Sequence, residues 1–300
     1  MDVARAAERL APYARPTPLV RSLLLSRDLG CELWVKNETV SPIASFKWRG
    51  ALNDILSDPS PVVTSSTGNH GQGVAWAARV AGVAAHVFLP LGANATKRAK
   101  IELLGATIHD TGHDLDDAKA QATEFARANG LRFIDDGESA GVIAGAGTVG
   151  LEIARELADI DVVYAPMGSG SLASGVAMAM PGTRVVAVQA KGSPAMVESF
   201  HARRAIERPI DTIAEGLVCR VPAQFALDAL IAHVANAVTV SDDELLAALR
   251  HMILGAQILV EPSGAAGLAA ALRDDVRGKR VVVIATGANI TAEVFRGLYA

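Results

Sequence analysis

One lysine and two glycine-rich turns are the residues of this sequence best suited to carry chemistry. Lys47 lies in the run 45–51 (SFKWRGA), and the turns 65–73 (SSTGNHGQG) and 168–172 (GSGSL) follow it along the chain. A lysine whose pKa is lowered by its surroundings is a good Schiff-base nucleophile. A turn of glycines that opens a helix directs several backbone N–H groups at an anion. The combination predicts a cofactor that forms an imine with lysine and carries a phosphate.

The turn at 65–73 has the residue types of a site that binds a carboxylate. It offers hydroxyl groups, an amide and backbone N–H groups at the start of a predicted helix, from Ser66, Thr67, Asn69 and His70. The competing interpretation is a helix cap built from ordinary turn residues. The turn at 168–172 follows a predicted strand and opens a helix over 172–180, which is the context of a phosphate cradle. It matches neither the P-loop nor the dinucleotide fingerprint, and a purely structural turn is its alternative.

A metal site is not predicted. His109 and His113 have a spacing that metal ligands use, with Asp110 and Asp114 beside them. Thr111 and Gly112 interrupt any helix that would align these side chains.

Composition limits the class of protein. The 300 residues carry a net charge of −4 and contain two cysteines without a Cys-x-x-Cys spacing. The charge argues against a nucleic-acid partner, and no apolar stretch reaches bilayer length. The sequence starts with an acidic amphipathic helix pattern and not with a leader, so a cytoplasmic location is expected.

Short apolar strands alternate with helices along the chain, which is typical of an open α/β fold. Three strands lead directly into turns: 61–64 into the Asn69 turn, 161–164 into the Gly168 turn, and 281–284 into 286–289 (TGAN). Further strands are predicted at 32–36, 85–89, 132–134 and 184–188. A capping box at Ser241 and Glu244 predicts a helix start. Ligands of such sheets collect at the carboxyl ends of the strands, so all three turns are expected to face one cleft.

With these motifs in order, the chain resembles the pyridoxal-phosphate enzymes of the tryptophan synthase β type (fold type II), and within them the serine/threonine dehydratase family. The resemblance covers nearly the whole chain. The motifs that carry it are 15–19 (RPTPL), 45–51 (SFKWRGA), 65–73 (SSTGNHGQG), 144–152 (AGAGTVGLE), 168–172 (GSGSL), 212–216 (TIAEG), 261–265 (EPSGA) and 286–289 (TGAN).

The resemblance implies a role for each part of the site. Lys47 would hold pyridoxal 5'-phosphate and remove the α-proton, Asn69 would bond its phenolic oxygen, and Thr286 would face its pyridine nitrogen, which favours β-elimination. The phosphate would lie on Gly168, Ser169, Gly170, Ser171 and Leu172. The substrate carboxylate would lie on Ser66, Thr67, Asn69 and His70. Glu261 is a candidate acid near the cleft, with an ordinary acid at a helix start as its alternative.

The sequence departs from the family pattern at several of these positions. Thr67 stands where serine racemases carry a serine, which puts racemisation in doubt. Ser169 and Ser171 replace glycines of the common turn and add hydroxyl groups that could bond the phosphate. Gln189 stands where metal-activated members have a glutamate, so a divalent-cation site is not expected.

The resulting prediction is a dehydratase that eliminates water from L-threonine, L-serine or both, giving a 2-oxo acid and ammonia. Another hydroxy amino acid (3-hydroxyaspartate or an aryl-serine), a β-replacement reaction and a serine racemase are alternatives, and a non-catalytic cofactor-binding protein is a further one. The family implies two open α/β lobes with the cofactor between them: a large domain of residues 1–50 and 140–300, and a small mobile domain of residues 51–139. It also implies a homodimer.

Overall fold

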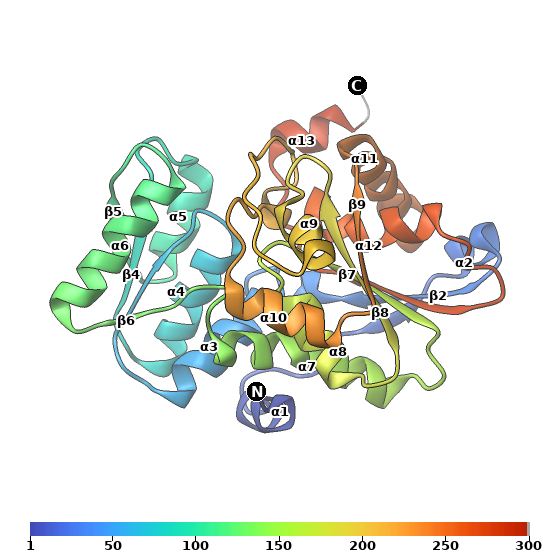
Figure 1. Cartoon of the computed structure of the whole chain (residues 1–300), viewed down its shortest axis with the longest axis horizontal. Coiled ribbons are helices and arrows are strands. Elements are labelled where there is room, and N and C mark those ends of the chain that lie inside the picture. The colour runs from blue at the N-terminus through green and yellow to red at the C-terminus, as the bar shows by residue number, and fades with distance from the viewer. Residues whose placement is uncertain (299–300) are drawn as a thin grey trace.

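The strands of the chain form two separate sheets. The structure is a computed structural model that describes residues 1–298. A six-stranded sheet has the order β1-β2-β10-β7-β8-β9, and a four-stranded sheet has the order β5-β4-β3-β6. Figure 1 shows the smaller sheet, in cyan and green, to one side of the larger one. The strands are β1 (Leu19–Arg21), β2 (Glu32–Asn37), β3 (Val62–Ser65), β4 (Ala85–Leu89), β5 (Thr107–Asp110), β6 (Arg132–Phe133), β7 (Val162–Pro166), β8 (Arg184–Ala190), β9 (Asn236–Val240) and β10 (Arg280–Ala285).

Helices connect these strands and cover the sheets. The α-helices are α1 (Val3–Leu10), α2 (Leu23–Leu29), α3 (Lys47–Ser57), α4 (Asn69–Ala81), α5 (Ala95–Leu103), α6 (Leu115–Asn129), α7 (Ala140–Glu156), α8 (Ser171–Ala179), α9 (Ala195–Ala202), α10 (Gln224–His233), α11 (Asp242–His251), α12 (Pro262–Arg273) and α13 (Ala292–Gly297). Short 3-10 turns are η1 (Glu38–Val40) and η2 (Glu215–Leu217), and η3 (Met252–Ala256) is a π-helical turn. The two-lobed α/β architecture predicted from the sequence is confirmed.

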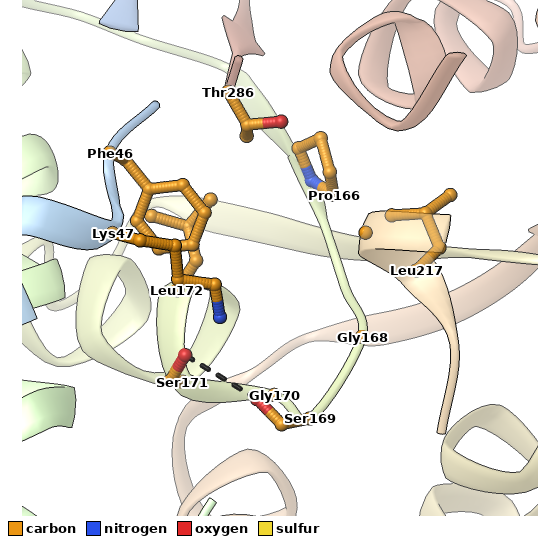
Figure 2. A pocket seen from close by; sticks show the side chains of 11 residues that line it. Phe46, Lys47, Pro166, Gly168, Ser169, Gly170, Ser171, Leu172, Leu217 and Thr286 are labelled. Carbon is orange, nitrogen blue, oxygen red and sulfur yellow. Dashed lines mark hydrogen bonds between the residues drawn. The ribbon is translucent and has the colours of Figure 1, made fainter. Parts of the chain in front are cut away.

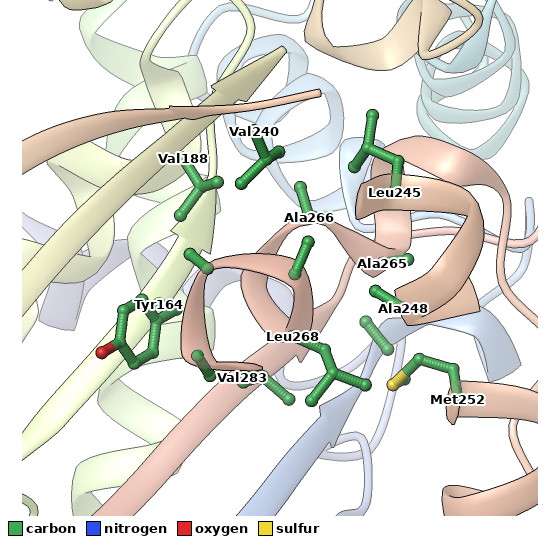
Figure 3. Packing of buried hydrophobic residues seen from close by; sticks show 14 of the residues in the cluster. Tyr164, Val188, Val240, Leu245, Ala248, Met252, Ala265, Ala266, Leu268 and Val283 are labelled. Carbon is green, nitrogen blue, oxygen red and sulfur yellow. The ribbon is translucent and has the colours of Figure 1, made fainter. Parts of the chain in front are cut away.

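The central strands are apolar on both faces because helices cover both sides of the sheet. Val163 packs with α7, α8 and α10 on one face, whereas its neighbours Val162 and Tyr164 pack with α11 and α12 on the other. Successive side chains of a strand point to opposite faces. One run of β-branched residues therefore contributes side chains to the hydrophobic cores on both faces of the sheet. Figure 3 shows α12 lying between the strand residues Tyr164 and Val283 and the α11 residues Leu245 and Ala248. The same strands end at the edge of the sheet where the predicted turns lie.

The capping box predicted at Ser241 is confirmed. The Ser241 hydroxyl accepts a hydrogen bond from the Glu244 backbone N–H at 3.2 Å, and the Glu244 carboxylate accepts one from the Ser241 backbone N–H at 2.6 Å. These bonds satisfy two N–H groups that a helix start otherwise leaves unpaired. Helix α11 therefore begins at Asp242, directly after β9.

Glycines let the lysine-bearing helix approach α7 closely. A Cβ atom added to Gly145 of α7 would lie 2.4 Å from the carbonyl oxygen of Arg49 on α3. Because the neighbour is backbone, which cannot rotate away, Gly145→Ala is expected to destabilise the protein by about 1–3 kcal/mol. Chemical denaturation measures this change.

The matched control is the same substitution at an open position. A Cβ at Gly297 of α13 meets no atom within 4 Å among the described residues, so Gly297→Ala is expected to leave stability unchanged or raise it by about 0.5–1 kcal/mol. Equal losses for the two variants would contradict the close-contact explanation.

No helix within residues 1–298 is long and apolar enough to cross a membrane.

Candidate active site

Lys47 is the first residue of α3, and the strand end at β10 fixes where that helix begins. The Phe46 backbone N–H donates a hydrogen bond to the Thr286 carbonyl at 3.0 Å, and Ser45 forms an isolated β-bridge with Gly287. Two segments far apart in the sequence are thereby joined. The Lys47 side chain is 14% exposed, and its neighbourhood includes Thr286 from the joined segment. The alternative of a solvated lysine at a helix start does not describe this residue.

One pocket gathers the predicted cofactor residues other than Asn69. It is lined by Phe46, Lys47, Pro166, Gly168, Ser169, Gly170, Ser171, Leu172, Gly216, Leu217 and Thr286. In Figure 2 the Lys47 amine points toward the Ser171 side of the turn, and the Thr286 hydroxyl lies across the pocket from it. Of the three turns expected to face one cleft, the Gly168 turn and the 286–289 turn line this pocket together with the lysine.

The Gly168 turn has the build of a phosphate cradle. It links β7 to α8, and Gly170 has φ +98°, a conformation that favours glycine. A Cβ on Gly168 would lie 2.8 Å from the Gly216 carbonyl oxygen, so a larger residue cannot replace it in place. The N–H groups of the first helical turn have no intrahelical acceptor, and the hydroxyl groups of Ser169 and Ser171 stand beside them. These donors fit a phosphate group next to an imine-forming lysine.

Asp136 is a site residue that the sequence reasoning missed. Its carboxylate contacts the Lys47 ammonium and accepts hydrogen bonds from Ser169 Oγ at 2.5 Å and Ser171 Oγ at 3.2 Å. His70 Nδ1 lies 3.6 Å from the same carboxylate. Asp136 follows β6, so it lies at the carboxyl end of a strand, as the predicted turns do. Its position directly after the strand predicted at 132–134 could have indicated a site residue.

The Asp136 carboxyl group is ionised at neutral pH. Burial by itself raises its pKa, but the positive charges of Lys47 and His70 and the hydrogen bonds from Lys47 and Ser169 outweigh this effect. The pKa of Asp136 therefore lies well below its usual range. An anion thus lies on the two serine hydroxyls of the turn.

The Asn69 turn opens α4, as predicted. Gly68 is the N-cap of the helix, so the N–H groups of Asn69 and His70 lie in its first turn. The His70 ring is buried, with Nε2 3.3 Å from the Ile134 carbonyl oxygen. Ser66 accepts a hydrogen bond from the Gly68 N–H at 3.2 Å through its hydroxyl. This helix start provides backbone donors for an anion close to Asp136.

Glu261 and Asn289 fix the orientation of Asn69. The Asn69 amide nitrogen donates to Glu261 Oε1 at 2.6 Å, and the Asn69 amide oxygen accepts from Asn289 Nδ2 at 2.7 Å. Glu261 occupies the N-cap position of α12, which agrees with the alternative of an acid at a helix start. Within the described residues, however, its side chain makes no capping hydrogen bond. Its carboxylate faces Asn69, so Glu261 lies in the active-site network.

Burial raises the pKa of Glu261 above its ordinary value of 4.5, although the hydrogen bond from Asn69 lowers it. A carboxyl group with a raised folded-state pKa contributes stability at low pH, and this contribution is lost as pH rises through the folded-state pKa. Glu261→Gln is therefore expected to gain stability relative to the wild type as pH increases from about 4.5 toward neutrality. Urea denaturation across pH measures this difference.

Glu8→Gln is the control for this measurement, because Glu8 is an exposed acid on α1. Its stability is expected to follow the wild type across the same pH range. A Glu261→Gln variant whose stability relative to the wild type falls or stays constant as pH rises toward neutrality would contradict the assignment.

The aromatic residues beside Lys47 have different roles. The Phe46 ring lies 5.0 Å from Lys47 Nζ and lines the pocket. Trp48 is buried and packs edge-on against Trp76, with ring centroids 5.7 Å apart. The amine therefore has one aromatic neighbour from the motif, and the other belongs to the core around the four-stranded sheet.

A buried ionic network supports the helix that carries Lys47. The Arg49 guanidinium donates to Glu38 Oε2 at 2.8 Å and to Glu152 Oε1 at 2.6 Å. Lys36 Nζ also contacts Glu152, at 2.7 Å. Two cations and two carboxylates balance in charge, which permits their burial. The network joins α3 to η1, β2 and α7.

Two lysines of α5 contact the segments around the large sheet. Lys97 forms an ion pair with Glu215 of η2, and Lys100 Nζ donates to Asn289 Oδ1 at 2.8 Å. Asn289 is the residue that also bonds Asn69. Helix α5 therefore connects to the site across the space between the two sheets.

His109 lies on β5, where its Nε2 is 3.0 Å from Nδ1 of His86 on the neighbouring strand. Within residues 1–298, no three His, Cys, Asp or Glu side chains are grouped so that they could hold a metal ion. Gln189 is fully buried and bonds to backbone, accepting from the Val197 N–H at 3.0 Å.

Comparison with known proteins agrees with this geometry. The family model described as "Pyridoxal-phosphate dependent enzyme" matches residues 10–287. The chain is 35% identical to the L-threonine ammonia-lyase of Thermotoga maritima over 96% of this chain and 75% of that protein. The processed form of threonine deaminase isoform 2 from Solanum lycopersicum superposes with a TM-score of 0.92 at 28% identity, covering 99% of this chain and 92% of that one.

Serine racemase from maize has the same fold. It superposes with a TM-score of 0.92 at 30% identity, covering 99% of this chain and 95% of that chain. The match to the family model, the lysine at the start of α3 and the cradle at the start of α8 lead to one conclusion. The chain belongs to the pyridoxal-phosphate-dependent enzyme family and takes pyridoxal phosphate as its cofactor.

Proposed function

We propose that this protein is an ammonia-lyase that eliminates water from a β-hydroxy-α-amino acid, with L-threonine and L-serine as the leading substrates. The unsaturated amine left by this elimination takes up water again, so the products are a 2-oxo acid and ammonia. The observation that carries the proposal is the shared pocket of Lys47, the Gly168 turn and Thr286. The similarity to an L-threonine ammonia-lyase at 35% identity supports the choice of substrate.

The protein side chains divide the work of binding. When bound, pyridoxal phosphate supplies the aldehyde that joins to amines and a ring that withdraws electrons from the substrate Cα atom. The hydroxyls of Ser169 and Ser171 and the N–H groups at the start of α8 hold its phosphate. The Thr286 hydroxyl would face its ring nitrogen. Lys47 holds it and accepts the proton from the substrate Cα atom.

Asn69 has one N–H left for the cofactor. An asparagine amide has two N–H donors, and Glu261 accepts one of them at 2.6 Å. Asn289 donates to the amide oxygen and so fixes which side carries the nitrogen. The second N–H is then available to the phenolic oxygen of the cofactor.

The substrate carboxylate binds at the start of α4. Backbone N–H groups of Asn69 and His70 and the hydroxyls of Ser66 and Thr67 supply donors at the positive end of that helix. The carboxylate is thereby held on the side of the four-stranded sheet.

The testing experiment combines a spectrum with product analysis. Visible absorbance of the purified protein is recorded before and after L-threonine is added, while 2-oxo acid and ammonia are measured. The expected result is a change of the cofactor band together with both products. A protein with no visible band after cofactor is added would overturn the proposal.

Other outcomes separate the alternatives. A band that changes without oxo acid, with the D-enantiomer formed, identifies a racemase, which Thr67 disfavours. Turnover of 3-hydroxyaspartate or an aryl-serine in place of threonine identifies another dehydratase. Consumption of the hydroxy amino acid only when a nucleophile is added, with a β-substituted amino acid formed in place of oxo acid, identifies a β-replacement enzyme. A stable band with no chemistry on the whole panel identifies a binding protein.

The domain assignment is also proposed: residues 51–139 as a small mobile domain, and residues 1–50 and 140–300 as the large cofactor-binding domain. It is supported by the origin of the strands, because β3 to β6 alone form the four-stranded sheet within the described residues. Helix α3 crosses the boundary, with Lys47 at the pocket and Leu52 in the core of the smaller sheet. The homodimer and the cytoplasmic location stay predictions from the family and the sequence.

A further inference from the structure

We propose that Asp136 is an internal competitor for the phosphate cradle: its carboxylate binds the serine hydroxyls that the cofactor phosphate needs, and cofactor binding displaces it. This inference rests on the proposed function of the Gly168 turn. The sequence motifs assign no role to Asp136. If it competes with the phosphate, the affinity for the cofactor depends on how strongly each of the two anions binds the cradle.

The contacts of Asp136 are those that a phosphate would make. Ser169 Oγ lies 2.5 Å and Ser171 Oγ 3.2 Å from the carboxylate, and the Lys47 ammonium contacts it directly. Carboxylates and phosphates seek the same hydroxyl and ammonium donors. Two anions at the same hydroxyls repel each other strongly in a partly buried pocket. The cradle therefore holds either Asp136 or the phosphate.

His70 offers Asp136 a second position. His70 Nδ1 is buried and has no hydrogen-bond partner within residues 1–298, although it lies only 3.6 Å from Asp136 Oδ1. The other ring nitrogen, Nε2, faces the Ile134 carbonyl. A carboxylate that leaves the serines can close this short gap and accept a hydrogen bond from Nδ1–H. The unpaired Nδ1 is an independent sign that a polar partner belongs there.

The local chain permits such a movement. Asp136 lies in a turn between β6 and α7, and because the Gly137 N–H donates to Asp135 Oδ1 at 2.8 Å, the movement is one of the Asp136 side chain. The preceding acid, Asp135, is held elsewhere by Lys119, with 2.6 Å between Nζ and Oδ2. Movement of Asp136 therefore breaks its contacts in the cradle and leaves the Asp135 ion pair in place.

Competition of this kind lowers the apparent affinity for the cofactor. The measured dissociation constant equals the intrinsic constant divided by the fraction of molecules whose cradle is free. If Asp136 fills the cradle in about nine molecules of ten, removing its charge tightens binding about tenfold. Inorganic phosphate reports the same competition without the Schiff base, because it binds the cradle alone.

The experiment uses the full-length protein after its cofactor has been removed. Pyridoxal phosphate is titrated by visible absorbance and inorganic phosphate by calorimetry, for the wild type, Asp136→Asn and Asp135→Asn. Asp136→Asn is expected to bind both about tenfold more tightly, and Asp135→Asn, which removes the same charge one residue away, is expected to match the wild type. Ser169→Ala is expected to weaken both, which checks that the titration reports the cradle.

Asp136→Ser keeps the test decisive if the asparagine variant folds poorly, because serine removes the charge and the reach together. Equal or weaker phosphate binding by folded Asp136 variants would overturn the inference. If pyridoxal phosphate still binds in that case, the proposed function stands and only the role of Asp136 falls. If no variant and no wild-type protein binds pyridoxal phosphate, both fall.

Discussion

Lys47→Ala is expected to remove the visible band of the lysine-bound cofactor and to lower kcat/KM for L-threonine by at least about 10³-fold. The alanine variant loses both the covalent attachment and the group that accepts the Cα proton. No other lysine of the described residues lines the pocket, so the neighbours offer no substitute amine. Spectra and oxo-acid assays of the reconstituted variant measure the two losses separately.

Two further variants define the reason for the loss. Lys47→Arg keeps a positive charge near Asp136 but forms no Schiff base, so it is expected to be as inactive as the alanine variant. Lys279→Ala removes a half-buried lysine outside the pocket, which bonds to the Asp275 carbonyl, and is expected to show wild-type activity. A Lys47→Ala protein that keeps the band would show that the cofactor is attached elsewhere.

Arg49→Met is expected to destabilise the protein by about 3–5 kcal/mol, because it leaves the buried Glu38 carboxylate without its cation. Glu38 is fully buried and takes two hydrogen bonds from the Arg49 guanidinium, at 2.8 and 2.9 Å. Glu152 takes two more from Arg49. Because α3 begins two residues earlier at Lys47, cofactor affinity is expected to fall as well. Urea denaturation and cofactor titration measure these effects.

The matched control is Arg27→Met. Arg27 is 74% exposed and pairs with Asp28 on the surface, so its loss is expected to change stability by less than about 0.5 kcal/mol. The double variant Arg49→Met/Glu38→Met tests the cause, since it removes the orphaned charge together with its cation. It is expected to recover part of the lost stability. A double variant with the full sum of both losses would argue for packing in place of charge.

The strands that could be predicted from the sequence are mainly the buried ones. β7 and β10 are runs of β-branched residues because both of their faces are covered, and such runs are visible in one dimension. The sequence pattern does not reveal β1, β5 and β9, which are three of the four edge strands of the two sheets. An edge strand is partly exposed, so polar residues such as His109 and Asn236 interrupt its pattern.

The site could be predicted where its residues lie in contiguous motifs, and it could not where single residues meet from distant segments. Lys47 and the Gly168 turn each carry a local signal. Asp136 reaches Lys47 across 89 positions, and Arg49 reaches Glu152 across 103. An isolated acid or arginine looks like a surface residue in sequence, because only its partners distinguish it from one.

The contacts that α5 makes with the segments around the large sheet depend on ionic strength. Lys97 and Lys100 reach Glu215 and Asn289 from the other sheet, so part of the attraction that holds the sheets together over the pocket is between charges at the surface. Dissolved salt screens such attractions over about 8–10 Å at physiological concentrations. Salt therefore loosens the α5 side of the pocket while leaving the buried pairs of Arg49 almost untouched. The contacts of α5 respond to the medium, and the support beneath Lys47 does not.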